Sequence, residues 1–134
     1  MSRQYAYSDS LSHKKLRLVD SYVIGGTNLL DFGAGTGELI QLEKSKFDNV
    51  YGVDSEDESI RIYEKRTKYK EKIHIIRNNG DVPRRLFGDI QFDWVAACDV
   101  LNTCNPNESI KLLKAFCSLL DSDGCLLLED LVFL

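Results

Sequence analysis

The chain has 134 residues, of which 43% are hydrophobic and 28% charged, proportions typical of a single globular domain. Its net charge of −4 argues against a nucleic-acid-binding protein, and no apolar run reaches the length of a membrane span. The four cysteines form no C-x-x-C pair and have no histidine at metal-ligand spacing, so we expect reduced thiols, a cytoplasmic protein and no metal site.

The first predicted elements lead from the N-terminus to a glycine-rich turn. Residues 1–9 are polar and predict an arm, and apolar positions at helical intervals predict a helix over 10–23. Two glycines end that helix, and a short apolar run predicts a strand over 28–32. After the turn, residues 38–46 predict a second helix.

Strands and helices alternate through the middle of the chain. Strands are predicted over 49–53 and 73–77, with a helix over 59–69 between them. Ser55 and Glu58 form a capping-box pattern before that helix, because each could bond a backbone amide near the other.

The last third of the chain continues the alternation. A short helical turn is predicted at 83–87 and a strand at 92–98. The Asn-Pro-Asn-Glu sequence at 105–108 combines a capping residue with a proline at the first helical position, and it opens a long amphipathic helix. Residues 121–124 predict a turn, and the final strand is predicted from 125 toward the C-terminus.

Five strands that alternate with helices predict an α/β fold, because right-handed crossovers make a parallel sheet with helices on both faces. In such a sheet, ligands bind outside the carboxyl ends of the strands. Asp31, Asp54, the turn at 78–81 and Asp99 all follow predicted strands. We therefore expect them to share one rim of the sheet.

The stretch from Asp31 to Gly37 carries the strongest functional signal. A strand, a turn with three glycines and a helix start together bring a ligand close to backbone amides. The dinucleotide-binding pattern would need a glycine at position 38, where the chain has Glu38. The pattern here is D-x-G-x-G-x-G, and it resembles motif I of class I S-adenosylmethionine-dependent methyltransferases.

The resemblance extends from Leu29 to Asp130 and implies a three-layer Rossmann-like fold with a mainly parallel sheet of order 3-2-1-4-5. It implies an S-adenosylmethionine-binding domain over 27–134, preceded by an N-terminal arm and helix over 1–26. Relatives continue into a sixth and a seventh strand, which we expect to be missing here, either because the chain ends naturally after the fifth strand or because it is a fragment of a longer one. We therefore expect the fifth strand to leave an apolar edge open and to pair there with a second copy as a homodimer.

The resemblance also implies a site for S-adenosylmethionine and its product S-adenosylhomocysteine at the rim. Asp54 matches the acidic residue that accepts both ribose hydroxyls, since a carboxylate can take two O–H donors. In the turn after the third strand, Asp81 is favoured over Asn79 for the adenine amino group. The cofactor-binding residues implied are Asp31, Phe32, Gly33, Ala34, Gly35, Gly37, Asp54, Ser55, Asn79, Gly80, Asp81 and Asp99.

Asp99 is the expected group nearest the methyl acceptor, followed by Asn102 and by Tyr5 or Tyr7 of the arm. The N/D-P-P-Y/F tetrad of enzymes that methylate nucleic-acid bases is absent at 99–102, which argues against that substrate class. Methyl transfer from a sulfonium is an in-line displacement that depends mainly on alignment. The sequence leaves the acceptor open, as a small molecule or a protein.

Several of these residues have a structural alternative. Asp54 is also suited to cap a helix, Asp81 to form a turn and Asp99 to orient a loop. His74 alternates within a strand and is expected to be structural, whereas His13 lies on a helix suited to cover the site. For the whole chain, the main alternative is a cofactor-binding or scaffold protein that keeps the fold without turnover; the glycine spacing disfavours an NAD-dependent oxidoreductase.

Overall fold

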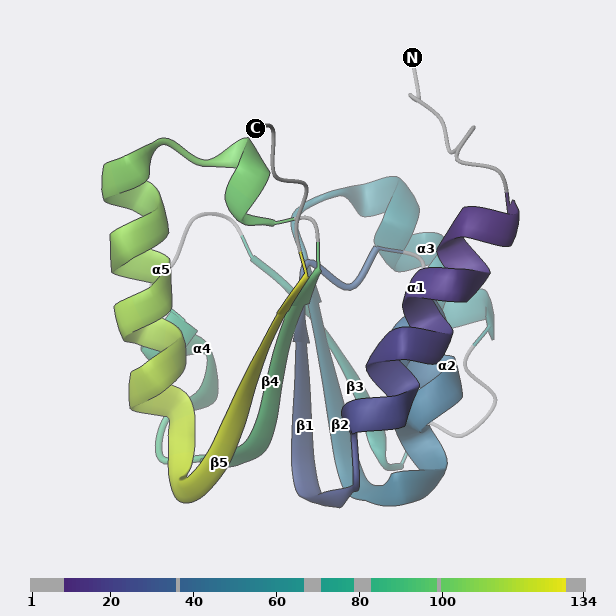
Figure 1. The fold of residues 1–134 in the computed structure, drawn as a ribbon, viewed down its shortest axis with the longest axis horizontal. Coiled ribbons are helices and arrows are strands. Elements are labelled where there is room, and N and C mark those ends of the chain that lie inside the picture. The colour runs from purple at the N-terminus through teal and green to yellow at the C-terminus, as the bar shows by residue number, and fades with distance from the viewer. Residues whose placement is uncertain (1–8, 36, 67–70, 79–82, 99, 130–134) are drawn as a thin grey trace.

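The computed structural model describes residues 9–35, 37–66, 71–78, 83–98 and 100–129 (Figure 1). Five strands form one sheet in the order β3-β2-β1-β4-β5, and every neighbouring pair is parallel, which confirms the predicted fold. The elements in chain order are α1 (Asp9–Tyr22), β1 (Gly26–Phe32), α2 (Glu38–Glu43), η1 (Lys44–Lys46), β2 (Phe47–Asp54), α3 (Asp57–Arg66), β3 (Ile73–Arg77), α4 (Pro83–Phe87), β4 (Phe92–Cys98), η2 (Leu101–Thr103), α5 (Pro106–Leu119) and β5 (Leu120–Glu129).

Helices cover both faces of the sheet, with α1, α2 and α3 on one side and α4 and α5 on the other (Figure 1). Successive residues of β1 point to opposite faces, so Leu29 joins the core under α1–α3 and Leu30 joins the core under α4 and α5. Both side chains are fully buried. A strand covered on both sides has no reason to alternate polar and apolar residues, which explains the continuous apolar run in the sequence.

Helix α5 begins as the sequence predicts. The Asn105 side chain accepts a hydrogen bond from the Glu108 amide at 2.9 Å, and the Glu108 carboxylate accepts one from the Asn105 amide at 3.0 Å. Pro106 occupies the first turn, where its missing N–H leaves no bond unmade. The helix ends at Leu119 and passes directly into β5.

The predicted capping box at the start of α3 is wrong. The helix begins at Asp57, two residues after Ser55, so Ser55 does not occupy the capping position. The amide of Glu56 instead donates to the Asp54 carboxylate at 2.9 Å, and the Glu56 carbonyl accepts the first bond of the helix from Ile60 at 3.1 Å. Asp54 therefore supports the chain just ahead of the helix, without occupying its capping position.

The predicted turn at 121–124 also differs, because the structure includes these residues in β5. Phe92 pairs with Leu120 and Trp94 pairs with Cys125, so β4 advances from 92 to 94 while β5 advances from 120 to 125. The extra residues make an irregular excursion within the strand. Within the described residues, β5 pairs with β4 alone and forms one edge of the sheet.

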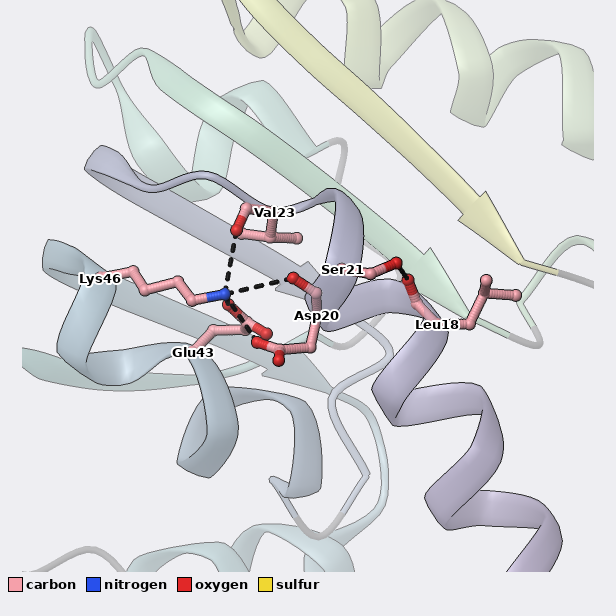
Figure 2. Close-up of polar contacts among 6 residues, drawn as sticks. All are labelled: Leu18, Asp20, Ser21, Val23, Glu43 and Lys46. Carbon is pink, nitrogen blue, oxygen red and sulfur yellow. Dashed lines mark hydrogen bonds and ion pairs between the residues drawn. The ribbon is translucent and has the colours of Figure 1, made fainter.

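Lys46 fastens the end of α1 to the domain (Figure 2). Its ammonium lies 2.6 Å from Asp20 Oδ1 and 3.0 Å from Glu43 Oε2, and it donates to the Val23 carbonyl at 2.9 Å. Carbonyls at the end of a helix lack donors within the helix, so the ammonium also serves as a cap. Burial raises the pKa of Glu43 to about 7; the Asp20 carboxyl adds to the rise and Lys46 opposes it.

Helix α1 begins near the carboxyl ends of the strands and runs back toward the ends where they start (Figure 1). The Lys46 contacts therefore hold α1 at the end of the sheet opposite the predicted rim. Within the described ranges, no helix is both long and apolar enough to cross a membrane.

Candidate functional site

Three strand ends meet at one edge of the sheet, as predicted. The amides of Gly33 and Ala34, just after β1, both donate to the Val53 carbonyl near the end of β2, each at 2.8 Å. The amide of Asn78, just after β3, donates to the Asp54 carbonyl at 2.9 Å. Hydrogen bonds therefore connect the glycine turn, the end of β2 and the residue after β3.

The Asp54 carboxylate joins two of the predicted site segments. Its Oδ2 accepts the amide of Gly35 at 2.8 Å, and its Oδ1 accepts the amide of Glu56 at 2.9 Å. Each carboxylate oxygen offers about two lone-pair sites, so both oxygens keep capacity for a further O–H donor. The side chain is half-buried at the rim, which leaves one side of it accessible. Ser55, the next residue, is exposed.

The glycine turn has two positions with different demands. Gly35 has φ +57 and Gly37 has φ +85, conformations that strain a residue with a Cβ. A Cβ at Gly37 would lie 2.4 Å from Cδ2 of Tyr63, whereas a Cβ at Gly35 would meet nothing within 4 Å. Gly37 therefore closes against the core, while the turn is open to a ligand at Gly35.

Asp31 lies in the interior beneath the glycine turn rather than on an open rim. Its exposed fraction is 3%, and its register partners in the neighbouring strands are Gly52 and Ala96, both small. Burial raises the pKa of Asp31 to about 7, with the negative charges of Glu38 and Asp54 adding to the rise. The sequence places this acid at the end of a strand but does not reveal its burial.

Sequence reasoning missed the packing that supports the turn. Tyr63 of α3 is 1% exposed and lies against Gly37, and burial followed by the charge of Asp31 raises the pKa of its hydroxyl. Val100 contacts the turn in the same way, since a Cβ at Gly33 would lie 2.7 Å from its Cγ2. The apolar periodicity of α3 was the available signal for Tyr63.

Of the other predicted site residues, some lie in the described part of the chain and the rest lie outside it. The Phe32 side chain packs edge-on against Phe116, with ring centroids 5.0 Å apart, so only its backbone adjoins the turn. Asn102 is exposed in η2. The residues that lie outside the described part of the chain are Tyr5, Tyr7, Asn79, Gly80, Asp81 and Asp99.

His74 has a packing role within the sheet. The His74 ring stacks on Tyr51, with centroids 4.5 Å apart, which agrees with the predicted structural role. The side chain of His13 lies outside the described part. Among the described residues, no group of three or more histidine, cysteine or acidic side chains is arranged to hold a metal ion.

A family model described as "Methyltransferase domain" matches residues 29–124, a range that includes the glycine turn and Asp54. The chain belongs to the methyltransferase domain family. No curated protein matches this methyltransferase domain.

Several solved structures share the fold of this domain. The DhpI–SAM–HEP complex has a TM-score of 0.78 and 19% identity, over 96% of this chain and 57% of that one. An S-adenosylmethionine-dependent methyltransferase from Clostridium acetobutylicum has a TM-score of 0.67 and 23% identity, over 89% and 47% of the two chains. Magnesium protoporphyrin IX methyltransferase from Synechocystis, solved with bound SAM, has a TM-score of 0.69 and 19% identity, over 90% and 62%. The domain thus spans about half to two thirds of the length of these relatives.

Proposed function

We propose that this methyltransferase domain binds S-adenosylmethionine at the carboxyl edge of the sheet and transfers its methyl group to a small-molecule or protein acceptor. The observation that supports this most directly is the hydrogen bond from the Gly35 amide to the Asp54 carboxylate. It brings the turn suited to the methionine part of the cofactor next to a carboxylate suited to the ribose. The cofactor is supported by family membership and by relatives whose structures contain SAM.

In this proposal the chain aligns the reactants rather than forming a covalent intermediate. A lone pair of the acceptor forms a bond to the methyl carbon as the carbon–sulfur bond breaks, and its electrons remain on sulfur as a neutral thioether. The acceptor loses a proton to solvent or to Asp99. Residues 78–81 would meet the adenine and Ser55 would flank the nucleoside, within a cofactor-binding unit over 27–134 that follows the arm and helix of 1–26. A cytoplasmic setting is supported by four cysteines that form no disulfide.

The alternative proposal is a domain that binds the cofactor or a partner without turnover. It accounts equally for the fold and the family match, and it differs from the first proposal only in the absence of methyl transfer. It predicts binding of S-adenosylmethionine, or none, together with no methyl transfer to any acceptor.

Calorimetric titration with S-adenosylmethionine and S-adenosylhomocysteine tests the cofactor site. We expect saturable binding by the wild type and loss of at least tenfold in affinity for Asp54→Ala, equal to about 1.4 kcal/mol or more. Asp48→Asn removes the same charge from an exposed position at the other end of β2 and should bind normally. Thermal unfolding of each variant separates lost contacts from lost folding. Absence of binding to folded wild type would remove the methyltransferase proposal.

We also propose that β5 pairs with β5 of a second copy, giving a homodimer. Support comes from its position at the sheet edge and from Leu128, which is 42% exposed. A row of unpaired amides and carbonyls beside an apolar side chain favours strand addition. Light scattering should give a dimer mass, and Leu127→Pro should shift it to the monomer because proline removes an amide and resists strand pairing. A monomer mass for the wild type at high concentration would contradict the dimer.

A further inference from the structure

The ion cluster that fastens α1 to the domain has more acidic groups than basic ones (Figure 2). The Lys46 ammonium lies 2.6 Å from Asp20 Oδ1 and 3.0 Å from Glu43 Oε2, so two carboxyls share one positive charge. The exposed fraction of Glu43 is 0%, and apart from that ion pair no described residue hydrogen-bonds to its carboxylate oxygens. Full ionisation would therefore leave an excess negative charge at a side chain that water does not reach.

A single proton restores the balance of charge. On Glu43 it supplies an O–H donor for the Asp20 carboxylate, which stays ionised beside Lys46. The pKa values of the two acids move apart accordingly: burial and then Asp20 raise the pKa of Glu43 to about 7, whereas Lys46 and then Glu43 lower the pKa of Asp20. Among the described residues, Asp20 and Lys46 are the charged groups that act on Glu43. The cluster is thus neutral with the proton and negative without it.

Helix α1 has a small apolar anchor. In and just after the helix, the described side chains buried in the core are those of Val19 and Val23. Leu18 and Tyr22 are 57% and 63% exposed. The helix packs against α2 and lies outside the sheet, so it can separate without breaking a hydrogen bond between strands. Gly25, between α1 and β1, gives the helix a point about which it can pivot.

We propose that Asp20, Glu43 and Lys46 form a proton-dependent latch, which holds α1 against α2 while the carboxyls share a proton and releases the helix when that proton is lost. The sheet stays folded in the released state. Release frees Glu43 from burial and from Asp20, so the released state binds the proton more weakly and is favoured as pH rises. The latch is independent of the proposed function, because its residues lie at the end of the sheet opposite the candidate site.

Amide hydrogen exchange at pH 6 and pH 8, corrected for the intrinsic effect of pH on exchange, tests the latch on the wild type. The pKa of Glu43 is about 7 with α1 docked and returns toward its ordinary 4.5 on release. Linkage then predicts that the opening constant of residues 9–22 rises about tenfold over this range. Helix α5 should exchange more slowly than α1 at both pH values, since it stays docked when the latch opens.

Glu43→Gln is the decisive variant, because its amide keeps a donor for Asp20 and cannot lose a proton in this range. Its opening constant for α1 should stay constant within about twofold from pH 6 to pH 8, whereas Asp48→Asn, an exposed acid, should keep the tenfold rise. Persistence of the rise in Glu43→Gln would assign it to another group and overturn the latch. The wild-type result decides alone if that variant does not fold: a constant opening of α1, or equal opening of α1 and α5, would also overturn it.

Discussion

Gly37→Ala should destabilise the domain by about 2–4 kcal/mol, the sum of backbone strain and steric overlap. The strain arises because φ is +85 at this position. The overlap arises because a Cβ would lie 2.4 Å from Cδ2 of Tyr63, a buried ring held between α3 and the sheet. Since the core is tightly packed, either the ring or the turn must move. Urea unfolding gives the change in the free energy of unfolding directly.

Gly35→Ala is the matched control, because it has a positive φ of +57 and open space at the Cβ position. It should cost about 1 kcal/mol, the backbone strain alone. In a Tyr63→Ala background, Gly37→Ala should also fall to about 1 kcal/mol, because the ring is gone. Equal costs for Gly35→Ala and Gly37→Ala in the wild-type background would contradict the proposed contact.

Stability should decrease as pH rises from 5 to 8, by about 2 kcal/mol for each of two buried carboxyls. The pKa values of Asp31 and Glu43 rise from 3.8 and 4.5 to about 7 on folding. The folded chain therefore holds these protons more tightly than the unfolded chain. The stabilisation is complete below the unfolded pKa values, and it is lost as pH rises through about 7, where the folded carboxyls must ionise in the core.

Denaturant unfolding at several pH values measures how steeply the free energy of unfolding falls with pH, which is the slope tested here. Glu43→Gln removes one titrating group while keeping a polar side chain beside Lys46, and it should reduce the slope by about half. Asp31→Asn should remove the other half. Asp48→Asn, an exposed acid, should leave the slope unchanged. A stability that is constant or increases between pH 5 and 8 would show that neither carboxyl is protonated in the folded domain.

Short-range patterns and parallel topology predicted the meeting of the glycine turn with Asp54, whereas the sheet order was implied by the resemblance to class I methyltransferases. The two capping patterns show where such reasoning ends. The box at Asn105 and Glu108 forms, whereas the similar pattern at Ser55 and Glu58 does not. The difference lies in Asp54, which accepts the Glu56 amide and so determines how the chain enters α3. A local pattern gave no information about that competing acceptor.

Long-range placement was the part that the sequence could not supply. The spacing of Glu43 and Lys46 is common on exposed helices, and only the fold brings Asp20 and the end of α1 to them. The burial of Asp31 likewise depends on its register partners, Gly52 and Ala96, which leave room beside it in the sheet. Register between strands distant in sequence cannot be read from hydrophobic periodicity alone.

The two backbone amides that bind the Asp54 carboxylate have a consequence for the energetics of recognition. A free acidic side chain loses rotamer entropy when a ligand orders it, at about 0.5–1.5 kcal/mol for an immobilised side chain. Gly35 and Glu56 hold this carboxylate before any ligand arrives, so that entropy is lost on folding. Association should therefore proceed as a rigid, single-step encounter at this residue. Shortening or lengthening its side chain would return the ordering cost to the binding step.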